Sequence, residues 1–135
     1  MPNNDSKVKS VNENSEPYGW SLLLSFHDVD DAKFDPKFIK QFGEELVDHL
    51  GMVRGPFHIW GSLKDENDTP YVKSDGLSAV QFLMESAVTS HFLDEIHKVY
   101  IDIFSCKEYD SFSAIQFCQD KIGGRLVQHQ SITRL

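Results

Sequence analysis

The sequence has few of the features that mark secreted or membrane proteins. It contains only two cysteines, Cys106 and Cys118, which form no CxxC pair and lack the dense, even spacing of a disulfide framework. No apolar run approaches the roughly 18–20 residues that span a bilayer. The N-terminus is polar and lacks the apolar segment of a secretory signal. These absences predict a protein of the reducing cytoplasm that has no membrane segment.

Positive charge is also scarce in this chain. Thirteen Lys and Arg residues stand against 21 Asp and Glu residues, so the formal net charge is −8. Without a dense basic cluster to neutralise phosphates, the chain is not expected to bind nucleic acid independently of sequence. Its acidity is compatible with cationic small molecules such as amines or sulfonium compounds. The histidines and cysteines show none of the usual zinc spacings, so no metal is predicted.

The chain divides into a polar tail and one domain. Residues 1–17 are rich in Asn, Ser, Lys and Glu and contain almost no apolar side chains. Such a segment cannot bury enough surface to offset the entropy of ordering it, so we expect a flexible tail. The remaining residues, 18–135, suit a single globular domain.

Hydrophobic periodicity predicts the order strand, helix, strands, helix, strand. The clearest helix begins at Asp35-Pro36, a capping residue followed by Pro in the first turn, and ends at Gly51. A second helix is expected over 111–122. A surface loop is expected over 61–76, and a short helix is the alternative to a strand over 88–97. Strands are expected over 18–26, 57–60, 77–86, 88–96, 98–106 and 126–132.

The connections between three of these strands decide the fold class. Residues 77–86, 88–96 and 98–106 follow one another too closely for parallel crossovers, so these strands must be antiparallel. With two helices in addition, the chain is predicted to be an α+β two-layer sandwich, with an antiparallel sheet and both helices on one face.

Reactive side chains are concentrated in the same three strand candidates, where antiparallel pairing can bring them together. They are Ser78, Glu85, Ser86, His91, Glu95 and Cys106. His91 and Glu95 share parity along one strand and would project from the same face. Taken singly, a strand Ser, a His or a Cys is most often structural, so the argument depends on the spacing of the whole set.

That spacing resembles the processing and catalytic segments of the short, prokaryotic S-adenosylmethionine decarboxylases. In that family a Gly-Val-Ser strand leads into a Glu-Ser cleavage site. A His follows the cleavage Ser by five residues, and a Cys follows it by twenty. The matching residues, with every offset kept, are Ser78, Glu85, Ser86, His91 and Cys106.

The resemblance implies a proenzyme that cleaves itself between Glu85 and Ser86. The Ser86 hydroxyl would attack the preceding carbonyl and convert the amide to an ester. Ser78 would hydrogen-bond the intermediate, and His91 would act as the acid–base group. Elimination would then free residues 1–85 as one chain and turn Ser86 into an N-terminal pyruvoyl group, the covalent cofactor of the other.

The same resemblance implies decarboxylation of a small-molecule substrate. The substrate amine would form a Schiff base with the pyruvoyl group, which accepts the electrons released when CO₂ leaves. Cys106 matches the residue that reprotonates the substrate carbon, and Glu95 matches an acid that contacts the ribose hydroxyls of S-adenosylmethionine. A homodimer of αβ protomers, packed sheet against sheet, and a role in polyamine (spermidine) biosynthesis are also implied.

The substrate-side segments depart from the family pattern. Phe92-Leu93-Asp94 stands in place of Thr-Trp-Pro, so Leu93 occupies the position of an aromatic residue, and Ser21 replaces a His. The loop after residue 60 is longer and more acidic than usual, and Trp60 is a candidate replacement for a stacking aromatic. The processing residues are therefore kept, while residues expected to contact the substrate have changed.

Three other hypotheses stay open. The substrate is an amino acid such as ornithine or arginine, because the pyruvoyl group requires only an α-amino carboxylate. Alternatively, the chain is a non-catalytic, unprocessed relative that binds and regulates an active homologue. A Ser or Cys hydrolase is the weakest of the three, because the sequence has no Gly-x-Ser-x-Gly motif.

Overall fold

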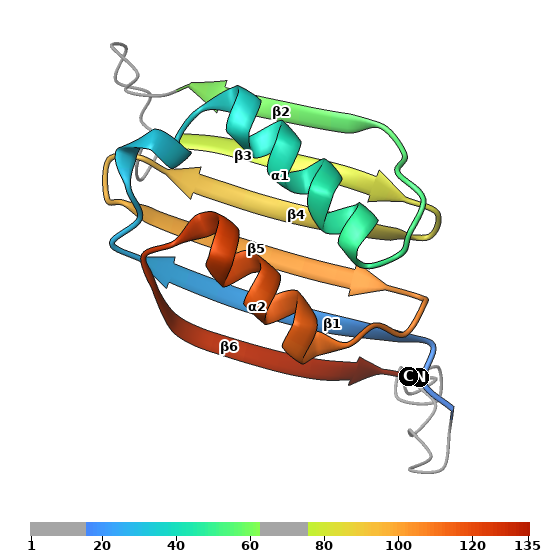
Figure 1. Cartoon of the computed structure of the whole chain (residues 1–135). Helices are drawn as coiled ribbons and strands as arrows, with labels where there is room; N and C mark the ends of the chain where they lie inside the picture. Colours follow the sequence, from blue (N-terminus) through green and yellow to red (C-terminus); the bar gives the residue numbers. More distant parts are fainter. Residues whose placement is uncertain (1–15, 63–75) are drawn as a thin grey trace, which may run out of the picture.

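The computed structural model describes residues 16–62 and 76–135, whose arrangement is shown in Figure 1. They form two α-helices, α1 (Pro36–His49) and α2 (Ser111–Ile122), and a 3₁₀ turn, η2 (Asp31–Lys33). The strands are β1 (Gly19–His27), β2 (Phe57–Ser62), β3 (Gly76–Leu83), β4 (Ser86–Leu93), β5 (Lys98–Ser105) and β6 (Arg125–Arg134).

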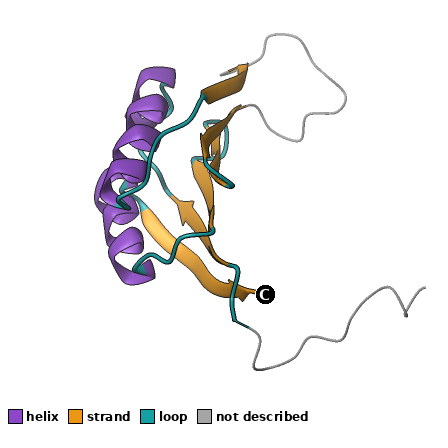
Figure 2. Ribbon diagram, turned by 90° about the vertical axis from the view of Figure 1, so that its right-hand side faces the viewer, coloured by secondary structure: helices purple, strands orange, loops and turns teal. Residues whose placement is uncertain are grey.

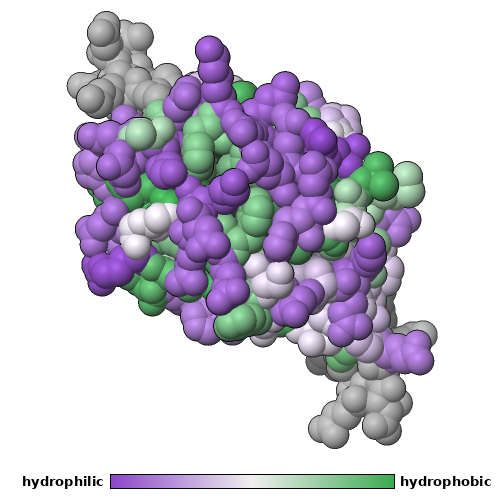
Figure 3. Space-filling model, in the orientation of Figure 1, coloured by the Kyte–Doolittle hydropathy of each residue, from purple (hydrophilic) through white to green (hydrophobic). Residues whose placement is uncertain are grey.

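The strands form one antiparallel sheet in the order β2-β3-β4-β5-β1-β6. Both helices cover the same face of this sheet, as the side view in Figure 2 shows. The predicted α+β two-layer sandwich is therefore confirmed. Hydrophilic side chains predominate on the outer surface of the helical layer (Figure 3), as expected for helices that bury one face.

The helices begin and end at the residues that the sequence indicates. The side chain of Asp35 accepts a hydrogen bond from the backbone N–H of Lys37 at the start of α1, and Asp110 does the same for Ser113 at the start of α2. Gly51 and Gly123 follow the two helices with φ of 70° and 71°, a conformation that glycine adopts without strain. Neither helix is long and apolar enough to cross a membrane.

Several of the predicted boundaries are wrong. The predicted strand 77–86 ends at Leu83, because Met84 and Glu85 form a turn and Ser86 begins the next strand. The predicted strand 88–96 ends at Leu93, and residues 94–97 form a turn. Gly61 and Ser62 extend β2 and Gly76 begins β3, so these residues do not belong to the predicted surface loop. The rest of that loop, 63–75, and most of the predicted flexible tail, 1–15, lie outside the described residues.

The core lies between the sheet and the helices and is centred on Phe92 of β4. This side chain is fully buried, and its ring packs edge-on against Phe34, Phe38 and Phe42 at centroid distances of 6.3–6.4 Å. Because successive strand residues point to opposite faces, the burial of Phe92 turns His91 toward the face without helices.

Replacing Phe92 with Ala is expected to lower the free energy of unfolding by about 3–5 kcal/mol, because it leaves a cavity among three aromatic rings. Urea denaturation of the full chain measures this loss. Phe112→Ala is the matched control, since the Phe112 side chain is 67% exposed on α2, and its loss should be below about 1 kcal/mol. Equal losses in the two variants would contradict this description of the core.

Candidate active site

The β3–β4 turn holds the peptide bond at which cleavage is predicted. Leu83 pairs with Ser86 across the hairpin, so only Met84 and Glu85 form the turn. Glu85 has a φ of 55°, in the left-handed region that residues other than glycine rarely adopt. Such a residue stores on the order of 1 kcal/mol of strain and persists only where its surroundings hold it. The structure therefore places backbone strain beside the Glu85–Ser86 bond.

Ser86 begins β4 and lies against Cys106, which follows β5. The Ser86 hydroxyl donates to the Cys106 sulfur at 3.5 Å, and the backbone N–H of Cys106 donates to Ser86 Oγ at 3.0 Å. The Cys106 thiol in turn donates to the carbonyl oxygen of Met84 at 3.8 Å. Two residues that lie 20 positions apart in the sequence are thus in direct contact, and the Ser86 hydroxyl oxygen is held from the β5 side.

A cleft of about 210 Å³ opens beside this pair. One wall comes from the segment after α1, including Met52 and Val53, and another from Lys107. The Lys107 ammonium group donates to the carbonyl oxygen of Gly51 at 2.9 Å, which ties the two walls together. Sequence reasoning missed these residues because no motif links the end of α1 to the end of β5.

Ser78 and His91 form a second cluster on the face without helices. They are direct partners across β3 and β4, and Ser78 Oγ lies 2.8 Å from His91 Nδ1. Trp60 lies opposite Ser78 on β2 and is 85% exposed. Together these three predicted site residues line a shallow cavity of about 310 Å³.

The two clusters do not meet within one chain. His91 follows Ser86 by five residues on β4, which is about 16 Å at the rise of a strand, and an odd separation places the two side chains on opposite faces. The expectation that antiparallel pairing would gather all the reactive residues is therefore wrong for a single chain.

Glu95 and Leu93 lie at the other end of β4 from Ser86. The strand ends at Leu93, and Glu95 is an exposed residue of the following turn. The prediction that Glu95 and His91 project from one face of a strand is wrong, because the strand does not extend to Glu95. Leu93 is half-buried and pairs with Lys98 of β5.

The two cysteines have different environments. Cys118 of α2 is fully buried in the core, and this burial raises the pKa of its thiol to about 12, so the thiol stays protonated and inert at neutral pH. Cys106 is only partly buried and faces Ser86. No group of three or more His, Cys, Asp and Glu side chains able to hold a metal ion occurs within residues 16–62 and 76–135.

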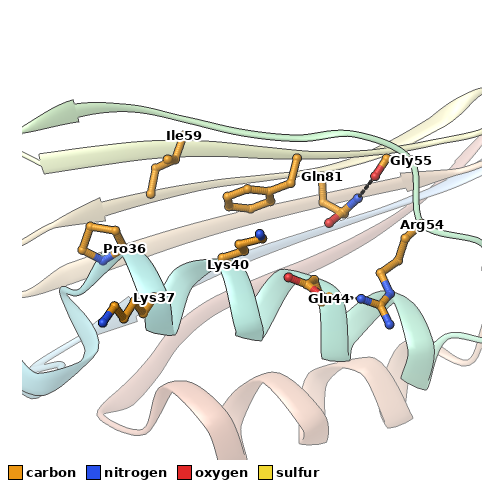
Figure 4. Close-up of a pocket in the computed structure, with 9 residues that line it drawn as sticks. Pro36, Lys37, Lys40, Glu44, Arg54, Gly55, Ile59 and Gln81 are labelled. Carbon is orange, nitrogen blue, oxygen red and sulfur yellow. Dashed lines mark hydrogen bonds and ion pairs between the residues drawn. The ribbon is translucent and has the colours of Figure 1, made fainter.

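A larger cavity of about 730 Å³ lies between α1 and the β2 edge of the sheet, away from every predicted site residue. Figure 4 shows the Gln81 side chain reaching the carbonyl oxygen of Gly55, a hydrogen bond of 2.8 Å, and the ion pair between Arg54 and Glu44. These contacts attach the segment before β2 to the sheet and to α1. We assign this cavity no part in the chemistry.

The fold is thus an α+β sandwich. Its β3–β4 hairpin has a strained Glu85 directly before Ser86, beside the Cys106 thiol, and a Ser78–His91 pair on the uncovered face. The chain belongs to the S-adenosylmethionine decarboxylase family, whose model matches residues 20–135. This is a family of decarboxylases that are generally pyruvoyl-dependent.

Comparison with solved structures identifies the same fold. The chain is similar to the crystal structure of the adenosylmethionine decarboxylase from Aquifex aeolicus, with a TM-score of 0.71 and 17% sequence identity. The match covers 89% of this chain and 92% of the other. No curated protein matches the chain.

Proposed function

We propose that this chain is the proenzyme of a pyruvoyl-dependent decarboxylase that acts on S-adenosylmethionine, in polyamine biosynthesis, and that it cleaves itself between Glu85 and Ser86. The observation that carries this proposal is the left-handed Glu85 followed by Ser86, whose hydroxyl is already in contact with Cys106. Family membership supplies the class of reaction.

Self-cleavage starts with attack of Ser86 Oγ on the carbonyl carbon of Glu85. The hydroxyl proton passes to a base, the C–N bond breaks and the nitrogen takes up a proton, which leaves an ester between the two residues. Loss of the Ser86 Cα proton then breaks the Cβ–O bond and frees the Glu85 carboxylate. Water hydrolyses the remaining enamine, as its imine tautomer, to the ketone and ammonia. Release of about 1 kcal/mol of strain at Glu85 would accelerate the first step about fivefold.

In this proposal the base for the step comes from a second copy of the chain. His91 is the acid–base candidate, and its ring is held by Ser78 at 2.8 Å, but the register of β4 keeps it away from Ser86 of its own chain. A homodimer packed sheet against sheet would let the Ser78–His91 pair of one copy serve the Ser86 of the other. The uncovered face supports such packing, because Trp60, Phe82 and Ile132 are exposed on it.

Once formed, the pyruvoyl group would supply an electrophilic carbonyl for the substrate amine and an electron sink for the loss of CO₂. The residues around Ser86 fit this use. Cys106 Sγ is 3.5 Å from Ser86 Oγ, which suits a general acid that protonates the product carbon. We assign substrate binding to Trp60, Leu93 and Glu95 of the second copy in the proposed dimer, because within one chain these residues lie away from Ser86.

An amino acid such as ornithine or arginine is the second candidate substrate. The cleft beside Ser86, about 210 Å³, is below the roughly 300–1,000 Å³ of pockets that hold larger ligands. Leu93 also removes an aromatic surface at which a nucleoside would stack.

Replacing Ser86 with Ala is expected to abolish cleavage, because no other atom can form the ester. SDS gels of the purified full chain after prolonged incubation measure this. Ser90→Ala is the matched control, since Ser90 is a buried serine of the same strand, and it should still cleave. Cleavage between 85 and 86 in Ser86→Ala would refute the mechanism, and an intact wild-type chain would favour the non-catalytic relative.

Coexpression of two inactive variants tests the shared site. His91→Ala chains expressed alone are expected to remain largely uncleaved, and Ser86→Ala chains cannot cleave because they lack the nucleophile. When the two are coexpressed with tags of different size, the His91→Ala chains should be cleaved, because a mixed dimer provides the missing imidazole. If the His91→Ala chains stay intact in the mixture, His91 does not act between copies.

Replacing Cys106 with Ala is expected to leave cleavage intact and to lower turnover by about 10²–10⁴-fold, as for loss of a general acid. Release of CO₂ from labelled S-adenosylmethionine, ornithine and arginine measures turnover and also identifies the substrate. Cys118→Ala is the control, because that thiol lies in the core. Normal turnover in the Cys106→Ala enzyme would remove Cys106 from the mechanism.

A further inference from the structure

We propose that Tyr18 is a positioning residue for self-cleavage and that it holds the Glu85 side of the bond in place for attack by Ser86. This inference rests on the proposed self-cleavage. Tyr18 lies just outside the residues that match the family model, 20–135, so family membership assigns it no role.

The Tyr18 hydroxyl contacts the residue before the predicted cleavage point. It donates a hydrogen bond of 3.0 Å to Glu85 Oε2, across 67 positions of sequence. Hydrogen bonds to a carboxylate are stronger than those between neutral groups. The Glu85 carboxylate raises the pKa of Tyr18, so the hydroxyl keeps its proton and remains a donor at neutral and mildly alkaline pH.

Contacts with three strands hold Tyr18 in position even though the residue is 54% exposed. Its backbone N–H donates to the carbonyl oxygen of Arg134 at the end of β6, at 2.7 Å. Its ring stacks on Phe104 of β5, with a centroid distance of 6.5 Å and an interplanar angle of 23°. Gly19 begins β1 so close to Phe104 that a Cβ would meet that ring at 2.8 Å. These contacts place the Tyr18 hydroxyl beside the Glu85 carboxylate.

The predicted cleavage bond is thus held from both sides. The backbone N–H of Cys106 fixes the attacking oxygen of Ser86 at 3.0 Å, and Tyr18 fixes the side chain of Glu85. Glu85 has a strained φ of 55° that its surroundings must maintain. Without the Tyr18 hydroxyl, the turn can relax, and the fraction of molecules in which the Glu85 carbonyl faces Ser86 Oγ falls.

Tyr18→Phe tests this role, because it removes the hydroxyl and keeps the stacked ring. We expect cleavage to slow about three- to tenfold, in line with the loss of one partly exposed hydrogen bond to a charged group. The rate is followed as disappearance of the full chain after cell-free synthesis. Tyr109→Phe is the control, because the Tyr109 hydroxyl makes hydrogen bonds to the backbone carbonyl oxygens of Trp20 and Ile103 and not to Glu85.

A coupled variant separates positioning from a purely structural effect. In a Glu85→Ala background the hydroxyl has no carboxylate to hold, so Tyr18→Phe should change the rate less than twofold if the coupling is direct. Two results would overturn the inference. One is an equal slowing of cleavage by Tyr18→Phe with Glu85 and with Ala at position 85. The other is a slowing of cleavage that is explained by a lower Tm of the Tyr18→Phe chain.

The outcome also distinguishes this inference from the proposed function. If the wild-type chain cleaves and Tyr18→Phe cleaves at the same rate, the role of Tyr18 is overturned and the proposed self-processing stands. A wild-type chain that never cleaves overturns both.

Discussion

The register of the β3–β4 hairpin determines the rest of the candidate site. Pairing Leu83 with Ser86 leaves a turn of only two residues, and this places Glu85 in the left-handed region directly before Ser86. The same register puts Ser78 opposite His91. A slip of one residue would turn every side chain of one strand to the other face, with Phe92 out of the core and His91 into it. The burial of Phe92 among three aromatic rings therefore stabilises the geometry of the turn as well as the fold.

This register also divides the chemistry between two places. The Glu85–Ser86 bond, the Ser86 hydroxyl and the Cys106 thiol lie together at one end of β4, while the uncovered face holds the Ser78–His91 pair and Trp60. A separation of about 16 Å along one strand cannot be closed by side-chain rotation. In the proposed mechanism, dimerisation and self-processing are consequently linked, and a chain that fails to assemble would stay a proenzyme.

Much of the fold could be predicted from the sequence, because its signals are local. Asp35-Pro36 and Gly51 bound α1, and period-two alternation marks the central strands. The end of β4 could not be predicted in this way, because the turn at residues 94–97 contains no Gly or Pro to mark it. The Ser86–Cys106 contact could be expected only from the spacing of these two residues, which resembles that of the family. No local pattern in the sequence indicates the Tyr18–Glu85 contact, because only the assembled sheet brings the two residues together.

The mass of the purified wild-type chain tests self-cleavage most directly. The mechanism predicts two fragments that separate between residues 85 and 86. The C-terminal fragment should lack the nitrogen of Ser86 and gain the mass of a carbonyl reagent such as phenylhydrazine. A single species of 15.4 kDa that does not react, before and after prolonged incubation, would contradict it.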